Sequence, residues 1–194
     1  MTSPAAAVVL AGGQGSRLGG ADKPGLLVGR RSLLQIALDA VRDCPTVVVG
    51  PPRALPAGVI AAREQPPGGG PAAALVAGVA ALPPLGEGAV VAVLAADLPG
   101  IDRATIARLA GTLAEQPAGS GADGAVLVDV DGRRQYLIGV WRLDRLISAI
   151  ALRPDWNGAP LRRLLAPIRT VQVAAVDRET ADVDTPEDWR RWQS

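Results

Sequence analysis

Short apolar runs of strand length recur along the chain, with stretches of helical pattern between them. The apolar runs cover residues 5–10, 47–50, 59–62, 89–95, 125–129, 136–141 and 170–175. The helical patterns cover residues 32–42, 71–82, 102–115 and 143–152, with Ser32 and Asp102 as expected N-caps, and Thr185-Pro186 predicts the start of a last helix. Such alternation is typical of βαβ units and a mostly parallel sheet. We therefore expect a Rossmann-like α/β fold of three layers, α/β/α, in a single domain over residues 1–194.

The composition restricts both the core and the chemistry. Hydrophobic residues make up 48% of the chain but aromatic residues only 3%, and Phe is absent, so the core must consist of Val, Leu, Ile and Ala. Without His, the chain has no Ser-His-Asp triad, no imidazole base and no His-containing zinc site. The single Cys44 excludes internal disulfides and cysteine clusters. Carboxylates, arginines, hydroxyls and one lysine remain for catalysis.

Charge and hydropathy indicate the compartment and the partners. Twenty basic and nineteen acidic residues give a net charge of +1 with no long basic run, so we expect no nucleic-acid partner. No stretch approaches 18 apolar residues without Pro, Gly or a charge, and the first residues lack the basic region of a signal peptide. We expect a cytoplasmic protein without a membrane partner, either a monomer or a weak homo-oligomer.

A glycine-rich segment follows the first apolar run, and residues 8–24 have the sequence VVLAGGQGSRLGGADKP. Glycines at the carboxyl end of a parallel strand let backbone N–H groups approach phosphates. The dinucleotide fingerprint would need Gly or Ala at Leu18, and a Walker loop would need Gly-Lys-Ser/Thr at residues 22–24. A solvent-facing glycine turn is the alternative. Lys23 is the only lysine among twenty basic residues, which favours a role for a compact ammonium on phosphate that Arg does not reproduce.

Four motifs carry a resemblance to a known family. The segment Leu10-Ala11-Gly12-Gly13-x-x-Ser16-Arg17-Leu18-Gly19 with Asp22-Lys23 resembles the signature loop of nucleotidyltransferases with the nucleotide-diphospho-sugar transferase fold. The later motifs are an acid followed by Gly-Pro in residues 64–74, AADLP at 95–99 and DVDTPED at 182–188. Together they resemble the molybdenum cofactor guanylyltransferases. The resemblance implies transfer of GMP from GTP to the terminal phosphate of molybdopterin, with release of pyrophosphate, formation of molybdopterin guanine dinucleotide and Mg²⁺ as cofactor.

The resemblance also implies the roles of individual residues. It assigns nucleotide binding to Leu10, Ala11, Gly12, Gly13, Gly15, Ser16, Lys23, Glu64 and Asp97, catalysis to Arg17, Lys23 and Asp97, acceptor binding to Gly70 and Pro71, and metal binding to Asp97 and Asp184. Arg17 and Lys23 would neutralise the departing pyrophosphate. Because the acceptor phosphate is already an anion, no general base is needed, and catalysis would consist of positioning and charge neutralisation.

Carboxylates near two of the motifs are the candidates for Mg²⁺. Asp97 follows an apolar run, so we expect it at the tip of a buried strand, with a turn-forming role in the Asp-x-Pro bend as the alternative. Asp182 and Asp184 alternate in what reads as an extended segment, so only one of them would face the site. We expect Asp184 there, with helix capping beside Thr185 as the alternative.

Several alternatives stay open at this point. Residues 10–13 are typical of guanylyltransferases, whereas Asp184 is more typical of cytidylyltransferases, so the two signals conflict on the nucleobase. A molybdopterin cytidylyltransferase, another nucleotidyltransferase of the sugar-1-phosphate type and a non-catalytic nucleotide-binding homologue are the other candidates. Glu64 would contact ribose or base, or lie in solvent. Trp141 is expected to pack in the core or at its rim rather than to form a platform for the pterin. Candidates for the acceptor phosphate, with a solvated surface as the alternative, are Arg133, Arg134, Arg153, Arg162 and Arg163.

Overall fold

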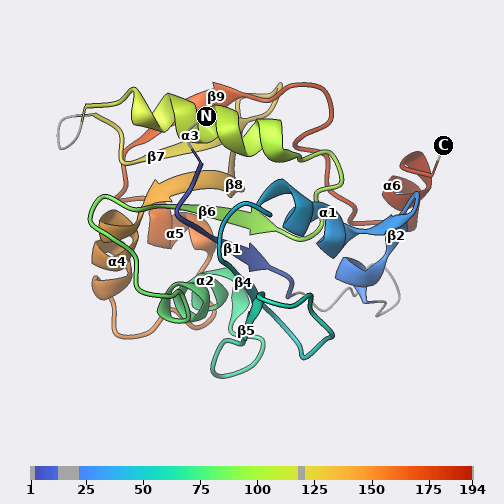
Figure 1. Ribbon diagram of the computed structural model, residues 1–194, viewed down its shortest axis with the longest axis horizontal. Coiled ribbons are helices and arrows are strands. Elements are labelled where there is room, and N and C mark those ends of the chain that lie inside the picture. Colours follow the sequence, from blue (N-terminus) through green and yellow to red (C-terminus); the bar gives the residue numbers. More distant parts are fainter. Residues whose placement is uncertain (1–2, 13–21, 118–120, 194) are drawn as a thin grey trace.

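The computed structural model describes residues 3–12, 22–117 and 121–193 (Figure 1). Its centre is a seven-stranded sheet in the order β5-β4-β1-β6-β8-β7-β9. The strands are β1 (Ala6–Leu10), β4 (Thr46–Val49), β5 (Ile60–Ala62), β6 (Val90–Ala95), β7 (Gly124–Val128), β8 (Arg134–Arg142) and β9 (Thr170–Ala174). β8 runs antiparallel to β6 and β7, and the other neighbouring pairs are parallel. The expected mostly parallel sheet is thus confirmed.

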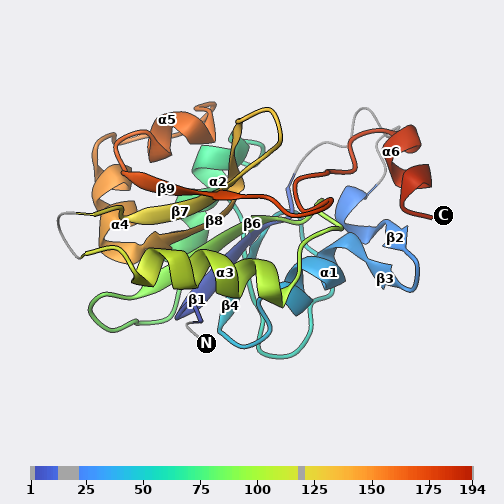
Figure 2. The same cartoon turned by 90° about the horizontal axis from the view of Figure 1, so that it is seen from above.

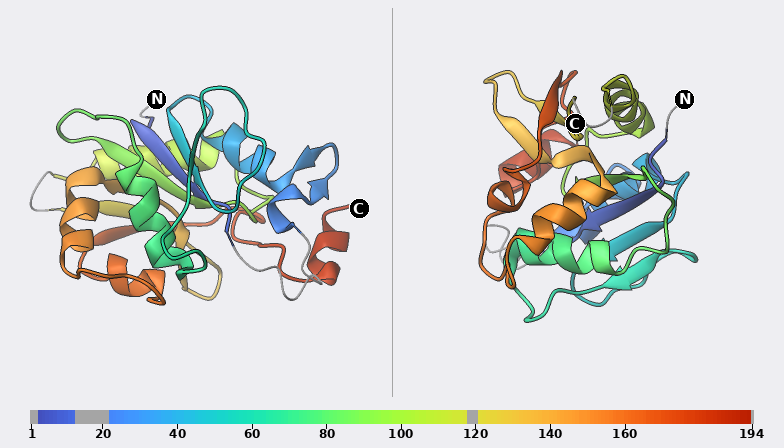
Figure 3. Two further views of the ribbon diagram at one scale, coloured as in Figure 1. Left: turned by 90° about the horizontal axis from the view of Figure 1, so that it is seen from below. Right: turned by 90° about the vertical axis from the view of Figure 1, so that its left-hand side faces the viewer.

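Helices cover both faces of the sheet, as the alternating pattern predicts. On one face lie α1 (Leu33–Ala40) and α3 (Arg103–Ala114), and on the other lie α2 (Gly70–Ala80), α4 (Leu143–Ala151) and α5 (Leu161–Leu165). In Figure 1, α3 lies above the strands and α2 below them, and the left view of Figure 3 shows α2, α4 and α5 grouped on one side. The three-layer α/β/α architecture is confirmed.

Successive residues of β1 supply the two halves of the core. Val9 packs with the apolar residues of α1 and α3, while Val8 packs with those of α2, α4 and α5. All five residues of the strand are buried, because a parallel strand covered on both faces has no polar side. Trp141 is fully buried in β8, as expected, and a Cβ on Gly124 would lie 2.5 Å from its ring. None of the helices among the described residues is long and apolar enough to cross a membrane.

The helix starts follow the capping residues. Ser32, Asp102 and Thr185 each form a capping box at the start of α1, α3 and α6 (Pro186–Arg191), respectively. Three short elements were not predicted: the two-stranded hairpin of β2 (Leu27–Val28) and β3 (Arg31–Ser32), the 3-10 turn η2 (Lys23–Gly25), and α5. α6 lies beside this hairpin at one end of the molecule (Figures 1 and 2), where the Trp189 indole donates a hydrogen bond to the Leu27 carbonyl at 2.7 Å.

The strand register brings four strand ends to one edge. Leu10 is opposite both Val49 and Ala95, and Val49 is opposite Ala62, so the carboxyl ends of β1, β4, β5 and β6 lie level with one another. The segments that follow these ends contain most of the polar residues selected from the sequence. In open parallel sheets this edge is where ligands bind.

Candidate active site

One ammonium group joins two carboxylates that are far apart in the sequence. Lys23 Nζ lies 2.7 Å from Asp97 Oδ2 and 2.5 Å from Asp184 Oδ1, and the Lys23 side chain is only 15% exposed. The structure therefore brings together the lysine, the strand-tip aspartate and the preferred aspartate of the last motif.

The backbone explains how Asp97 and Asp184 come to the same place. Asp97 stands two residues beyond the end of β6, as the sequence predicts. The buried Val183 donates its N–H to the Asp97 carbonyl at 3.1 Å, which holds the last motif against this strand end. Thr185 then caps α6 through its hydroxyl, so helix capping belongs to Thr185 while the Asp184 carboxylate contacts Lys23.

The electrostatics of this cluster follow from its composition. Burial by itself would lower the pKa of Lys23, but the charge of Asp97 and the hydrogen bonds to both carboxylates outweigh it, so the pKa lies above its ordinary value. Desolvation, followed by the charges of Asp184 and Asp97, raises the pKa of Asp182, and Lys23 partly opposes this shift. The segment around Asp182 is not a strand, so strict alternation does not apply, and the Asp182 carboxylate lies within electrostatic reach of the cluster. Of the two aspartates, Asp184 is the one that contacts Lys23.

A cavity of about 590 Å³ lies beside the cluster at the carboxyl edge of the sheet. Six of the residues selected from the sequence line it, namely Leu10, Gly12, Glu64, Gly70, Pro71 and Asp97. Glu64 Oε1 accepts a hydrogen bond from the Gly68 N–H at 2.9 Å, whereas its Oε2 is buried without a partner among the described residues. A buried carboxylate oxygen without a donor is costly, so this wall of the cavity suits a ligand that carries an N–H or O–H group.

The first turn of α2 shapes the same wall. Gly70 has a φ of +87°, a conformation that glycine adopts without strain, and Pro71 follows in the first turn of the helix. Ala11, by contrast, is buried in the core and is not among the residues that line the cavity. Gly13, Gly15, Ser16 and Arg17 lie outside the described residues, so their assigned roles stay predictions.

One cationic residue of the cavity was not predicted. Arg63 lines it directly after β5, and the arginines nominated for the acceptor phosphate, Arg133, Arg134, Arg153, Arg162 and Arg163, are not among the lining residues. The sequence did contain an indication of this role for Arg63. Arg63 is adjacent to Glu64 and directly follows the apolar run 59–62, which ends at the same edge of the sheet.

The two aspartates are the residues that could hold a metal ion. Among the residues that the structure describes, no group of three or more His, Cys, Asp or Glu side chains is arranged to hold a metal. Asp97 and Asp184 nevertheless converge on a single cationic point, which the Lys23 ammonium marks. Mg²⁺ is commonly bound by one or two carboxylates together with phosphates and water, so this donor set fits Mg²⁺ in company with a phosphorylated substrate.

Comparison with protein families matches residues 7–174 to the MobA-like NTP transferase domain. The chain belongs to this family. The match includes Lys23, Glu64 and Asp97 and ends with β9, so the cluster of this MobA-like domain is completed by Asp184 from outside the matched region. Comparison with curated proteins gives no significant match.

Solved structures share the fold of this MobA-like domain at low sequence identity. Molybdopterin-guanine dinucleotide biosynthesis protein A from Archaeoglobus fulgidus has a TM-score of 0.69 at 18% identity, with 97% of this chain and 96% of that chain covered. A nucleotidyl transferase from Methanothermobacter has a TM-score of 0.72 at 23% identity, with 97% and 95% covered. The 2-C-methyl-D-erythritol 4-phosphate cytidylyltransferase of Thermus thermophilus has a TM-score of 0.66 at 19% identity, with 96% of each chain covered. These similarities establish the nucleotidyltransferase fold.

Proposed function

We propose that this nucleotidyltransferase transfers GMP from GTP to molybdopterin. The observation that carries the proposal is the convergence of Asp97 and Asp184 on Lys23 at the rim of the cavity that Glu64 also lines. The sequence Leu10-Ala11-Gly12-Gly13 supports guanine, and the acceptor follows from the resemblance to molybdenum cofactor guanylyltransferases.

In the proposed reaction an oxygen of the acceptor phosphate attacks the α-phosphorus of GTP, and the bond to the β-phosphate breaks to release pyrophosphate. The attacking oxygen is already ionised, so a site without histidine suffices. Lys23 would offset the negative charge of the triphosphate, and Arg63 would attract the acceptor phosphate. The unpartnered Glu64 oxygen would accept a hydrogen bond from the base or the ribose.

Asp97 and Asp184 would hold Mg²⁺ in this reaction. When bound, the ion supplies charge neutralisation at the phosphate oxygens. The glycine-rich segment would place the triphosphate through its backbone N–H groups. Preorganised charges and hydrogen-bond donors are the largest source of rate enhancement in sites of this kind.

One observation favours a second candidate. Asp184 contacts Lys23, and an aspartate at this position is typical of cytidylyltransferases, so transfer of CMP from CTP to molybdopterin is the competing proposal. The acceptor and the chemistry would be the same in both reactions.

The test is release of pyrophosphate by the purified chain with Mg²⁺ and each of the four NTPs, with and without molybdopterin. We expect release with GTP only when molybdopterin is present, and loss of release in Asp97→Asn. Release with CTP in place of GTP would support the second candidate, and no release with any NTP would contradict both.

A further inference from the structure

Arg53 connects the two sides of the glycine-rich segment. It lies in the loop after β4, directly after Pro51 and Pro52 in the sequence, yet its side chain is only 14% exposed. Its Nη2 lies 3.1 Å from Asp22 Oδ1 and donates a hydrogen bond to the Ala11 carbonyl at 3.3 Å. Ala11 stands just before the glycine-rich segment and Asp22 just after it, so one guanidinium holds the chain at both places.

The Ala11 side of this connection is fixed by the sheet. The Ala11 N–H donates to the Val49 carbonyl at 2.8 Å, which continues the pairing of β1 with β4. Gly50 allows the close approach, because a Cβ there would lie 2.7 Å from the Ala11 carbonyl oxygen. Ala11 and the start of the loop that contains Arg53 are therefore held firmly against each other.

On the Asp22 side, the carboxylate contacts Arg53. The Asp22 side chain is 65% exposed and makes no capping hydrogen bond to the 3-10 turn η2, although the Asp22 carbonyl accepts the Gly25 N–H at 2.9 Å. Exposed carboxylates are ordinarily mobile, and an exposed ion pair contributes little to stability. The Arg53 side of the pair is different, because its guanidinium is mostly buried and its Nε has no partner among the described residues. A buried guanidinium has few positions open to it, so it fixes the carboxylate that binds it.

Lys23 is the next residue after Asp22, and its side chain reaches Asp97 and Asp184. The position of its ammonium therefore depends on where the backbone of residues 22–23 is held. On the other side of Lys23, the ring of Pro24 restricts the backbone conformation of Lys23.

We propose that Arg53 is a positioning residue for Lys23: by binding the Ala11 carbonyl and the Asp22 carboxylate, it sets the backbone from which the Lys23 ammonium reaches the two aspartates. The proposal concerns the free protein, and its catalytic consequence rests on the proposed nucleotidyl transfer. Small displacements of a charge-neutralising group reduce the rate of a reaction whose catalysis depends on positioning.

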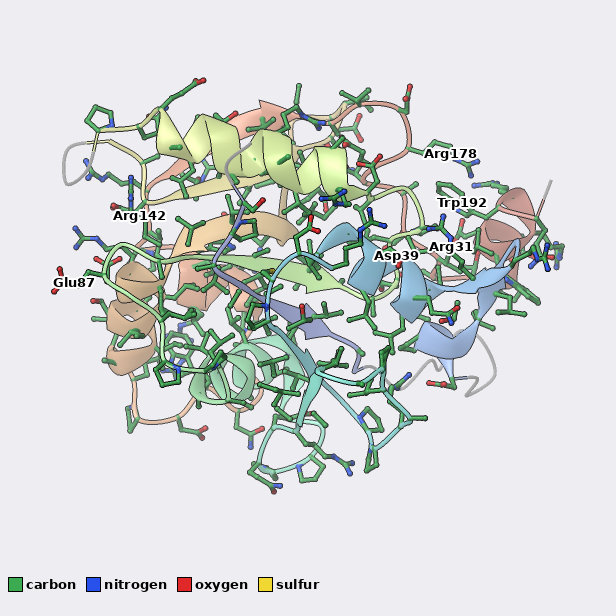
Figure 4. All side chains as sticks on the ribbon, in the orientation of Figure 1. Arg31, Asp39, Glu87, Arg142, Arg178 and Trp192 are labelled. Atoms are coloured by element: carbon green, nitrogen blue, oxygen red, sulfur yellow. The ribbon has the colours of Figure 1, made fainter. Side chains whose placement is uncertain are left out.

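The single lysine provides a direct readout in the free protein. In a sample labelled with ¹⁵N at the lysine side chain, the only ammonium signal comes from Lys23. We expect Arg53→Met to shift this signal or broaden it through faster exchange with water. Without Arg53 the backbone of residues 22–23 is held less firmly, so the ammonium is held less closely to Asp97 and Asp184. Arg31→Met is the matched control, since Arg31 also pairs with an aspartate, Asp39, at 3.0 Å, and this pair is labelled in Figure 4.

A second variant tests the connection without opening space around a buried side chain. Asp22→Asn removes the charge that Arg53 binds, at a side chain that is 65% exposed, and should change the signal in the same direction as Arg53→Met. A Lys23 ammonium signal that is the same in the parent, Arg53→Met and Asp22→Asn would overturn the proposal.

Pyrophosphate release separates this proposal from the proposed function. If the parent is active with Mg²⁺, GTP and molybdopterin, we expect kcat/KM to fall about tenfold or more in Arg53→Met and to stay unchanged in Arg31→Met. If the parent releases no pyrophosphate with any NTP, the proposed function fails, while a signal change confined to Arg53→Met and Asp22→Asn still supports the positioning role.

Discussion

The N–H of Val183 donates to the carbonyl of Asp97 at 3.1 Å and joins the last motif of the chain to the end of a central strand. Val183 is buried, so this contact is anchored by packing as well as by the hydrogen bond. Its effect is that Asp184, the next residue, shares the Lys23 ammonium with Asp97. The candidate metal ligands are thus positioned by backbone contacts that substitutions of their side chains leave in place.

Asp97→Asn should keep the fold and remove most of the activity. Asparagine has the same shape but no negative charge, so both Mg²⁺ binding and the pairing with Lys23 weaken. We expect pyrophosphate release to fall on the order of a hundredfold or more in a protein that remains folded. Asp131→Asn, in an exposed ion pair with Arg133, is the control and should be silent. Normal turnover by Asp97→Asn would contradict the assignment of Asp97 as a metal ligand.

Asp184→Asn should reveal how many carboxylates the metal needs. Since Asp184 and Asp97 converge on the same point, we expect a two-ligand site and a loss of roughly tenfold or more in pyrophosphate release. The Mg²⁺ concentration that gives half-maximal rate should rise in parallel. Unchanged use of GTP and Mg²⁺ would show that Asp97 suffices.

Lys23→Ala should remove roughly 2 kcal/mol or more of transition-state stabilisation, because charge-assisted contacts in a desolvated site are strong. Lys23→Arg retains the charge but replaces a compact ammonium by a broad planar group, so its rate should fall between those of the parent and Lys23→Ala. The measurement is steady-state pyrophosphate release at saturating Mg²⁺. Equal rates for all three proteins would place Lys23 outside the site.

Glu179 should make the stability of the chain sensitive to acid. Burial alone would raise the pKa of this carboxyl, but hydrogen bonds from Arg108, Thr105 and the Val176 N–H outweigh burial, so its pKa lies below the ordinary value of 4.5. A lowered pKa stabilises the fold fully at neutral pH, and this contribution is lost as the pH falls below 4.5 and through the lowered pKa.

The measurement is urea unfolding of the parent and Glu179→Gln at several pH values. At neutral pH we expect the variant to lose about 2 kcal/mol of unfolding free energy, since charged hydrogen bonds to a buried carboxylate are lost. The difference between the two proteins should shrink as the pH falls. Glu187→Gln, which breaks an exposed pair with Arg190, should show little effect at any pH. A difference for Glu179→Gln that is independent of pH would contradict this explanation.

Local patterns predicted much of the fold. The apolar runs gave the strands of the main sheet, and Ser32, Asp102 and Thr185 marked helix starts because a capping box depends only on residues three positions apart. The direction of β8 was not predictable, since an apolar run is the same in a parallel and an antiparallel strand. The hairpin of β2 and β3 has strands of two residues each, which is too short for a periodic signal.

Local patterns also predicted part of the candidate site. The apolar run before Asp97 predicted that this residue lies at the tip of a buried strand. The acid followed by Gly-Pro in residues 64–74 was the basis for selecting Glu64. The contact between Lys23 and Asp184 spans 161 positions, so the only indication of it was the resemblance to a family. The ion pair of Arg53 with Asp22 had no signal in the sequence, because each residue alone is an ordinary surface charge.

The Lys23 ammonium also has a consequence for how the site is assembled. Two carboxylates directed at one point repel each other, and the lysine supplies a counter-ion that belongs to the chain itself. The two carboxylates and their counter-ion are therefore brought together by folding itself. Under the proposed function, substrate and metal would meet these charges already in place and would replace the Lys23 ammonium as the counter-ion of the two carboxylates.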